Sequence, residues 1–593
     1  MLKVVGASWL QTRISTYILV AVALLGLGAI ILGEFGHVEQ DGTYSATVSW
    51  NRKGGYRIDF WGQGNDLTAI PLHAARAYYK TGIFEHGWSF IEIETSSKYP
   101  DTVRLFYTQL DGLEAGWKFA VRRSRVSVTL ESDDFLWLAL ASDLPGFQQA
   151  FNISAPKMSS MIYFKSLPKE NSEPLITIGH NTAAPYAQML RLLKKYTFNY
   201  HVLPMTKTAA LTPSKSIIMS SYPGALSSSD EFYLMKGENR ELIITGTSLL
   251  ATSPNNWSFL YPKDHVMLTV RLMAANRLAT NGQSWFNTMS HQNGGATARQ
   301  WISFEPRSTT ILLVEQLPSV SVAMNYTEEF KKTGFISYVG ISNFQNINDI
   351  VQPAKKDINV WNDSLTRLQE NITTYEQFRE MMRGCSQEDC TVDEQNSKAN
   401  LLQELTYRGE LGDVPIPYGI IDTKILAIDV DGFESFEAIS GPATSRSRPP
   451  FTWSKNFPNI SHIGHPDTFD FESVNPQWVW IYYTLQENND FTTVFKGKNE
   501  FLFYYHLECR YGSDTSSFKY FFIGGDTIYV TNFVYLNISI LNYIIFRIYS
   551  YRSKGKTRRT VIDNYFTYIP LSFEKRVSLF ACACLLTLPS GGS

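Results

Sequence analysis

The sequence contains little cysteine: five residues among 593, with none before Cys385. This scarcity excludes a small scaffold held by disulfides, so buried apolar side chains must provide the stability of the fold. Cys385 and Cys390 flank the short segment Ser-Gln-Glu-Asp, which is short enough for a local disulfide in an oxidising compartment. The same stretch lacks the additional ligands of a metal site. We therefore predict one disulfide, no bound metal and no cofactor.

The chain has no strong excess of charge of either sign, with 53 Lys and Arg against 55 Asp and Glu. This balance gives no electrostatic basis for binding nucleic acid or for attraction to an acidic membrane surface. A hydrophobic content of 44% excludes a mainly disordered chain. The 37 Phe and 32 Tyr favour an interior rich in β-strands, because aromatic side chains pack well on pleated sheets.

Several common catalytic motifs are missing from the sequence. It contains no G-x-S-x-G, no H-E-x-x-H and no G-x-x-x-x-G-K-[ST]. The tetrapeptide His462–His465 matches a nucleotide-binding signature, but it precedes Pro466 and lacks a preceding strand of the required kind. Asp429–Gly432 resembles part of a calcium loop, yet positions one and twelve would be Ala427 and Ala438, which cannot bind the ion. Neither segment therefore predicts a site.

The N-terminal sequence has the pattern of a targeting signal. Lys3 and Arg13 precede an uncharged apolar run over residues 14–33, the arrangement of a secretory signal. The run is also long enough to span a bilayer, and its small residues form no clear Ala-x-Ala cleavage site. Residues 1–33 are thus either a cleaved signal peptide or a retained signal anchor. In both cases the remainder of the chain lies outside the cytosol.

Potential glycosylation sites agree with secretion. The sequence contains seven N-x-S/T sequons without proline at the middle position, at Asn152, Asn256, Asn325, Asn362, Asn371, Asn459 and Asn537. One such tripeptide often occurs by chance, but together with the N-terminal signal they predict a glycoprotein.

Periodicity and turn residues predict strands interleaved with helices. The expected strands are Tyr44–Trp50, Tyr56–Trp61, Trp88–Glu94, Met161–Ser166 paired with Leu175–Gly179, Ser216–Ser220, Glu241–Thr245, Ile311–Glu315 and Ile420–Ile428. The expected helices are Leu67–Tyr79, Val103–Phe119, Tyr186–Tyr196, Val266–Leu278 and the polar segment Asp357–Arg383. No repeat of 20 to 50 residues is present, which excludes solenoids and propellers. Without regular βαβ alternation, the pattern favours a layered α+β fold.

A series of short signatures occurs in order between residues 158 and 467. They are Met158–Ile162, Gly179–Thr182, Ser220–Gly224, Asp230–Tyr233, Asn276–Ala279, Gln300–Trp301, Ile421–Lys424, Ser440–Pro442, Pro449–Trp453 and Gly464–Asp467. In order and spacing this series resembles the phospholipase B-like family. The resemblance covers about residues 44–478, and residues 479–593 have no counterpart, so they are predicted to be a C-terminal extension of unknown structure.

The resemblance implies an αββα sandwich of the N-terminal-nucleophile hydrolase type. In that family an internal cut creates an N-terminal cysteine, whose thiolate attacks an acyl carbonyl while its own α-amine acts as base. Met158 stands at the position of that cysteine, and a thioether has no proton to lose. Ser159 becomes the candidate nucleophile, with Ser160 as the alternative. The resemblance also implies that His180 and Asn181 face the nucleophile or form the oxyanion hole.

Two further positions depart from the family pattern. Ala183 stands where tryptophan is usual after the His-Asn-Thr sequence, which removes part of the pocket wall. Arg299 replaces an asparagine before Gln300-Trp301, and Glu305 takes the place of a nearby acid.

Two functions are consistent with these features. The first is an acyl hydrolase that removes fatty acyl chains from glycerophospholipids, or cleaves a related amide, in the lysosomal lumen or outside the cell. The second is a catalytically inactive glycoprotein that binds lipid or protein. We expect a phospholipid or another acylated small molecule as partner, transient contact with a membrane surface, and no nucleic acid. A single-pass ectodomain anchored in the membrane is the alternative for its location.

Overall fold

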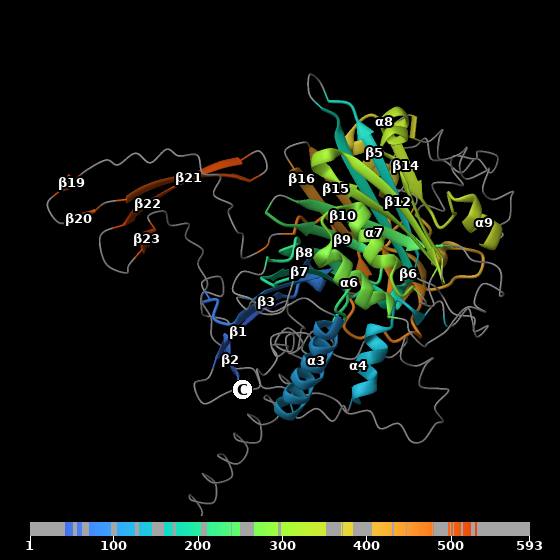
Figure 1. Cartoon of the computed structure of the whole chain (residues 1–593). Helices are drawn as coiled ribbons and strands as arrows, with labels where there is room; N and C mark the ends of the chain where they lie inside the picture. Colours follow the sequence, from blue (N-terminus) through green and yellow to red (C-terminus); the bar gives the residue numbers. More distant parts are fainter. Residues whose placement is uncertain are drawn as a thin grey trace, which may run out of the picture. The chain divides into compact units, whose positions relative to one another are not determined.

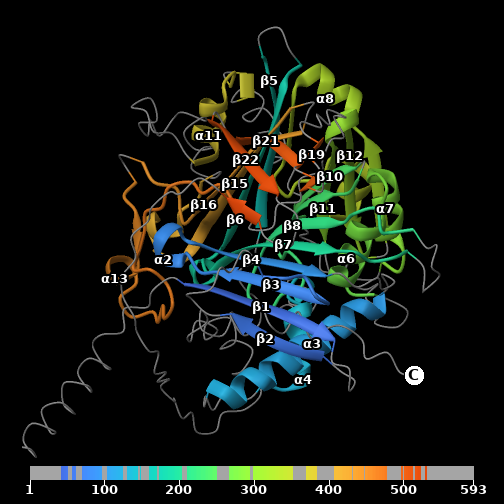
Figure 2. The same cartoon turned by 90° about the vertical axis from the view of Figure 1, so that its left-hand side faces the viewer.

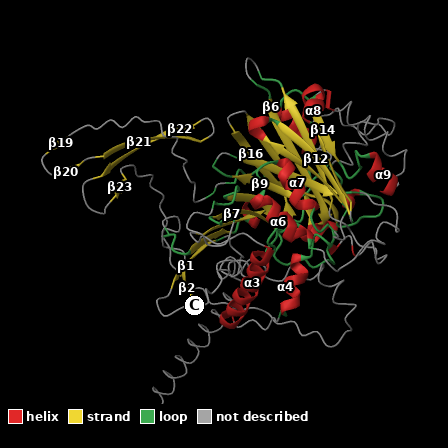
Figure 3. Ribbon diagram, in the orientation of Figure 1, coloured by secondary structure: helices red, strands yellow, loops and turns green. Residues whose placement is uncertain are grey.

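A computed structural model of the chain describes residues 42–50, 56–61, 70–95, 103–124, 130–144, 147, 159–169, 173–202, 210–238, 240–249, 266–293, 298–318, 320–351, 369–370, 372–383, 406–429, 432–445, 448–476 and 478, and the strands between 496 and 530. Apart from Gly42, these residues belong to the compact unit Thr43–Ser593. Strands predominate among them, with fewer helices (Figure 3). The predicted α+β class is confirmed at this level.

The larger sheet has eleven strands. In chain order these are β1 (Thr43–Trp50), β2 (Tyr56–Trp61), β3 (Ala75–Lys80), β4 (Trp88–Thr95), β7 (Arg191–Phe198), β8 (Ser216–Ser221), β9 (Phe232–Lys236), β10 (Glu241–Ser248), β11 (Arg299–Glu305), β12 (Thr310–Leu317) and β13 (Val320–Asn325). Their order across the sheet is β13-β12-β11-β10-β9-β8-β7-β4-β3-β1-β2, part of which can be followed in Figure 2. Only the central β4–β7 pair is parallel; the other neighbours are antiparallel.

The smaller sheet has five antiparallel strands in the order β14-β5-β6-β15-β16. They are β5 (Ser159–Leu167), β6 (Leu175–Pro185), β14 (Phe335–Tyr338), β15 (Tyr418–Asp429) and β16 (Gly432–Ser440). Strands β6 and β15 are almost entirely buried along their length, so they lack the alternation of a strand with one face in water. Both faces of this sheet must therefore be covered.

The helices and short turns lie outside these sheets. They are α2 (Ile83–His86), α3 (Val103–Ser124), α4 (Ser132–Ala139), α6 (Leu268–Leu278), α7 (Gly282–Ser290), α8 (Thr327–Thr333), α9 (Gln345–Val351), α11 (Tyr375–Arg383), α13 (Trp453–Asn456) and the 3-10 turns η1 (Tyr186–Gln188), η3 (Pro306–Ser308) and η5 (Gly409–Leu411). The remaining strands are β17 (Phe451–Thr452), β18 (Thr468–Phe469), β19 (Lys496–Gly497), β20 (Glu500–Phe501), β21 (Phe503–Tyr511), β22 (Asp514–Phe522) and β23 (Ile528–Val530). The last five of these strands form two small sheets of their own.

Three hydrophobic clusters define the packing. Apolar residues of α3, α4, α6 and α7 join one face of the larger sheet, and Figure 1 shows α6 and α7 lying across it. Ile178 and Leu426 of the smaller sheet pack with Ile302 and Leu313 of the larger one. Phe378 and its neighbours on α11 cover the other face of the smaller sheet. The succession is therefore helices, sheet, sheet and helix.

Most predicted elements are present, and two predicted helices are wrong. The described part of the predicted helix Leu67–Tyr79 has no helix: residues 70–74 are irregular and lead into β3, where buried and partly exposed residues alternate with the period of a strand. The predicted helix Tyr186–Tyr196 is η1 followed by β7. Since β7 lies between β4 and β8 in the sheet centre, all its side chains are buried and its sequence shows no alternation. Of the predicted helix Asp357–Arg383, the described part is α11 with residues 369–370 and 372–374 before it.

Several predicted features lie outside the described residues. These are the apolar run 14–33, Cys385 and Cys390, and the sequons at Asn152, Asn256, Asn362, Asn371 and Asn537. The two described sequon residues, Asn325 and Asn459, have exposed side chains. In the part of the chain that the structure describes, no helix is both long enough and apolar enough to cross a bilayer.

Because of the packing between the sheets, alanine substitutions at two isoleucines should differ in their effect on the stability of the protein. Ile178→Ala removes a fully buried side chain from the inter-sheet core, so we expect a loss of about 2–5 kcal/mol in the free energy of unfolding. Ile463, whose side chain is 45% exposed, is the matched control, and Ile463→Ala should change stability by less than about 0.5 kcal/mol. Denaturant titration measures both. Equal losses would contradict the packing described.

Candidate active site

The three predicted catalytic residues lie on two neighbouring strands of the smaller sheet. Ser159 is the first residue of β5 and pairs with Ala183 of β6. His180 and Asn181 lie further back along β6. Met158, the residue before Ser159, lies outside the described residues.

His180 and Asn181 point to opposite faces of the sheet. Asn181 Nδ2 donates to the backbone oxygen of Met382 in α11, at 2.8 Å. The His180 ring instead meets the ring of Phe232 from β9, with centroids 5.5 Å apart. Successive strand residues alternate between faces, and β6 continues through both positions. The structure therefore does not bring these two side chains together.

Ser159 and Ser160 also lie on opposite faces of the smaller sheet. Ser159 is half-buried, and its hydroxyl forms a hydrogen bond with that of Tyr418 at the start of β15. Ser160 is buried opposite Thr182, and its backbone N–H donates to Thr247 Oγ1 of β10 at 2.8 Å. By strand alternation Ser159 shares the α11 side with Asn181, whereas Ser160 lies on the side facing the larger sheet.

A buried carboxylate organises the space between the sheets. Asp230, which precedes β9, accepts hydrogen bonds through Oδ2 from Thr182 Oγ1 at 3.0 Å, Ser220 Oγ at 2.8 Å and Lys424 Nζ at 2.7 Å. Its Oδ1 accepts one from Ser228 Oγ at 2.8 Å. Thr182 and Lys424 belong to the smaller sheet and Ser220 to the larger one, so the Asp230 carboxylate links the two sheets directly.

Two further ionised groups complete what we call the four-charge cluster, made of Arg191, Asp230, Asp422 and Lys424. Arg191 Nη2 donates to Asp230 Oδ2 at 2.6 Å, and its Nε lies 2.8 Å from Asp422 Oδ2. Lys424 also pairs with Asp422. The Arg191 guanidinium lies 4.4 Å from the ring centroid of Tyr222. All four charged side chains are fully buried, and their formal charges cancel.

Asp230 and Arg191 stay ionised despite their burial. Burial by itself would raise the pKa of Asp230, but the Arg191 and Lys424 cations hold that pKa well below its ordinary value. Burial likewise opposes the charge on Arg191, yet Asp230 and the other acidic neighbours raise its pKa. Opposite charges at hydrogen-bond distance outweigh the cost of removing each group from water.

His180 is a neutral group beside this cluster. Burial, followed by the nearby Lys424 ammonium, lowers the pKa of His180 to about 3. Its Nε2 lies 3.4 Å from the backbone oxygen of Gly246. A histidine with this pKa is a poor base at neutral or mildly acidic pH, although it can still donate and accept hydrogen bonds.

Glu231 is a second unusual carboxyl group, next to the cluster. It is fully buried with a left-handed φ of 60°, a conformation that costs a residue with a side chain about 1–3 kcal/mol. Trp301 Nε1 donates to its Oε2 at 3.1 Å, and Arg299 Nε lies 3.8 Å from its Oε1. Burial raises the pKa of Glu231 to about 7, although Arg299 and Trp301 act in the opposite direction. The acid beside Trp301 is therefore Glu231.

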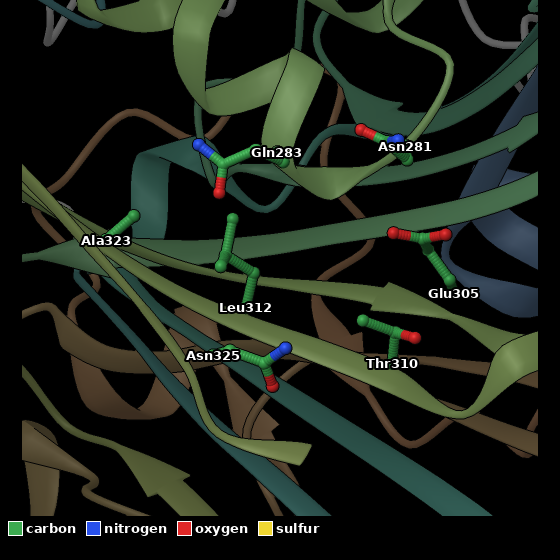
Figure 4. A pocket seen from close by; sticks show the side chains of 7 residues that line it. All are labelled: Asn281, Gln283, Glu305, Thr310, Leu312, Ala323 and Asn325. Atoms are coloured by element: carbon green, nitrogen blue, oxygen red, sulfur yellow. The ribbon is translucent and has the colours of Figure 1, made fainter.

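Glu305, which the sequence pattern suggested for that acid, lies elsewhere. Its Oε1 accepts from the backbone N–H of Gly282 at the start of α7, at 2.9 Å. It lines a half-open hollow of about 340 Å³ (Figure 4). The other lining residues are Asn281, Gln283, Thr310, Leu312, Ala323 and Asn325. None of the predicted catalytic residues lines it.

Sequence reasoning missed the four-charge cluster. Asp230, Asp422 and Lys424 occur in the family-like signatures, but no role followed from that, and Arg191 was placed in a helix that does not form. The available signal was the presence of charged residues within strongly apolar runs, as in Ile421-Asp422-Thr423-Lys424-Ile425. Among the described residues, no group of three or more His, Cys, Asp or Glu is placed to hold a metal ion.

Fold and site together define an α+β protein with two facing sheets and a buried polar centre where the sheets meet. The profile of the family described as Phospholipase B matches residues 98–476, well over half of the chain. The chain belongs to this family.

Named relatives agree with the family match. The phospholipase B-like protein lamina ancestor of Drosophila melanogaster is 26% identical, over 81% of this chain and 100% of its own length. Phospholipase B-like 2 of Homo sapiens is 28% identical over 66% of this chain and 72% of its own. Phospholipase B-like protein D of Dictyostelium discoideum is 26% identical over 74% and 81%.

The four-charge cluster predicts that Lys424 is essential to stability. Lys424→Met leaves Asp230 and Asp422 buried with only Arg191 to balance them, so unfolding free energy should fall by about 3–5 kcal/mol. Lys169 forms a more exposed ion pair with Asp429 at 2.7 Å, and Lys169→Met should cost less than about 1 kcal/mol. Thermal and denaturant unfolding compare the two. Similar losses would rule out a special role for the cluster.

The raised pKa of Glu231 implies that the stability of the fold depends on pH. Its pKa is raised from 4.5 to about 7 in the folded state, so it stabilises the fold at low pH and this contribution is lost as pH rises through 7. Glu231→Gln should therefore change the stability difference between about pH 5 and pH 8 by about 2 kcal/mol relative to wild type. His180, with its lowered pKa, acts in the opposite direction below about pH 6.5, but equally in both proteins.

The control for this measurement is Glu328, whose side chain is 86% exposed. Glu328→Gln should give a curve of stability against pH parallel to that of wild type. A parallel curve for Glu231→Gln would show that this carboxyl group does not titrate in the expected range.

Proposed function

We propose that the protein is an acyl hydrolase of the N-terminal-nucleophile type, which removes fatty acyl chains from glycerophospholipids. The observation that carries the proposal is the Phospholipase B match, which covers the whole smaller sheet, strands β7 to β13 of the larger sheet and all three candidate residues. The succession of helices, sheet, sheet and helix supports this fold type. The N-terminal signal and the sequons support release into the lysosomal lumen or outside the cell.

The proposed chemistry begins with cleavage of the chain before Ser159. Ser159 Oγ attacks the carbonyl carbon of Met158, the C–N bond breaks, and the resulting ester is hydrolysed by water. Residue 158 then ends in a carboxylate, and Ser159 carries a free α-amine. That amine, with an ordinary pKa near 8, lies on the same residue as the nucleophile and can take its proton.

In the hydrolytic cycle, Ser159 Oγ attacks the acyl carbonyl of the lipid as its proton passes to the α-amine. The tetrahedral intermediate collapses, the lysolipid alcohol leaves with that proton, and the serine ester remains. Water, deprotonated by the amine, then releases the fatty acid and restores the serine. Asn181, which shares the Ser159 side of the sheet, is the proposed oxyanion donor, and its Nδ2 would have to leave the Met382 carbonyl.

His180 has a supporting place in this scheme. Since its pKa is about 3 and its side chain faces the larger sheet, it does not compete with the α-amine as base. We propose that it holds β6 against β10 through Gly246 and so fixes the position of Asn181.

A second candidate function is favoured by one specific observation. Met158 stands at the cysteine position of the family pattern, and a hydroxyl is a weaker nucleophile than a thiolate. A catalytically inactive member that binds lipid or protein through the same fold would tolerate this substitution.

The N-terminal sequence of the mature protein separates the two functions. If Ser159 is the nucleophile, the mature chain contains a fragment that begins at Ser159, and Ser159→Ala abolishes both the cut and fatty acid release, by at least about a thousandfold. Ser160→Ala is the matched control and should retain the cut. An uncut wild-type chain without deacylase activity would overturn the proposal.

Met158→Cys tests whether the rest of the site is competent. With a thiol restored at the family position, cleavage should move to the bond before residue 158, and deacylase activity should appear or rise. Edman sequencing and release of labelled fatty acid measure the two effects. A gain of activity in Met158→Cys with a silent wild type would support the inactive-member function.

A further inference from the structure

A short loop beside the candidate site exposes an unusual amount of apolar surface. Within residues 407–416, which we call the apolar loop, four large side chains are exposed: Tyr407 by 39%, Leu411 by 49%, Val414 by 78% and Ile416 by 42%. Single exposed apolar residues are common on proteins, but a group of four on one loop marks a surface that contacts something apolar.

Buried polar contacts fix the shape of this loop. Arg408 Nε donates to Glu410 Oε1 at 2.6 Å, and both side chains are buried. Arg408 Nη1 also donates to the backbone oxygen of Pro449 at 2.7 Å, while the Tyr186 hydroxyl donates to the Glu410 carboxylate. The apolar side chains are thus held outward by a preformed scaffold, which reduces the entropy lost when they bind.

The apolar loop leads directly to the candidate nucleophile. Tyr418, two residues after Ile416, forms the hydroxyl contact with Ser159. The rings of Tyr407 and Tyr418 lie 6.3 Å apart, so apolar surface continues from the loop to this contact. The Ser159 end of β5 therefore lies next to the apolar loop.

We propose that the apolar loop inserts into a phospholipid surface and places Ser159 at the lipid boundary. This inference rests on the proposed acyl hydrolase function, because that function supplies the lipid occupant. Charge supports it: Asp413 is the only exposed charged residue within 407–416, and the loop has no exposed Lys or Arg. Binding is therefore driven by burial of apolar side chains and not by attraction to anionic head groups.

Flotation of the full-length protein with vesicles tests the insertion. Wild type should float with vesicles of pure phosphatidylcholine, and neither added salt nor added phosphatidylglycerol should strengthen binding. The double variant Leu411→Asp/Val414→Asp should bind vesicles at least about tenfold more weakly, because the charged aspartate side chains stay hydrated and do not enter the apolar part of the bilayer. Trp137→Asp, on α4, is the matched control with a side chain that is 56% exposed, and it should bind as wild type does.

Three results would overturn the inference. These are wild type that stays in solution, equal binding by wild type and the double variant, and equal loss in Trp137→Asp. A change in oligomeric state of the double variant without vesicles would assign the loop to a protein contact and overturn it as well. Thermal unfolding of each variant checks that the fold is intact.

Vesicle flotation measures lipid binding without requiring catalysis, so its outcome is independent of fatty acid release. Ser159→Ala leaves the apolar loop unchanged and should float with the vesicles like wild type. If no variant or wild type releases fatty acid but flotation still depends on Leu411 and Val414, the hydrolase proposal fails and the lipid-binding surface stands.

Discussion

The arrangement of the two sheets depends on the four-charge cluster between them. Apolar side chains bring the sheets together, but apolar burial has no direction and would tolerate a shift of one sheet over the other. Ion pairs and charge-assisted hydrogen bonds require defined geometry. Asp230 and Arg191 belong to the larger-sheet side, and Asp422 and Lys424 to β15, so their contacts fix one relative position. Thr182 and Ser220 bind the same carboxylate and are fixed with it.

Sequence patterns predicted the strands of this centre better than its geometry. β5, β6 and β15 followed from apolar runs between turn residues. The segment 186–196 was predicted as an amphipathic helix because leucines at 192 and 193 lie near one apolar side and Lys194-Lys195 form a basic C-terminal end. The sheet centre instead buries all four of these side chains. Buried lysines are rare enough that the pattern favours a helix with a solvated face. Only tertiary contacts, such as Lys195 Nζ with Glu92 Oε1 at 2.6 Å, make the strand acceptable.

The predicted catalytic side chains lie on opposite faces of the sheet because the strand that carries two of them is longer than predicted. The predicted strand ended at Gly179, so His180 and Asn181 were treated as residues of a strand end, where the direction of a side chain is not constrained. In the structure β6 continues to Pro185, and alternation then sends adjacent side chains to opposite faces. The paired strands β5 and β6 present Ser160, Thr182 and His180 on one face of the sheet, and Ser159 and Asn181 on the other. The position of the strand end therefore decided which residues could cooperate, and local sequence determines strand ends poorly.

Two groups of the inter-sheet centre keep the same charge state between neutral and lysosomal pH, whereas Glu231 beside them gains a proton as the pH falls below about 7. Asp230 is ionised and His180 neutral at both neutral and lysosomal pH, because their pKa values are lowered far below that range. The described contacts that build this centre are made by residues other than Ser159, whose hydroxyl contacts Tyr418 on the opposite side of the sheet. The fold and the candidate nucleophile are therefore held by separate interactions. A substitution at the nucleophile position leaves the ion pairs between the sheets intact, so a chain can retain the family architecture whether or not it retains the family chemistry.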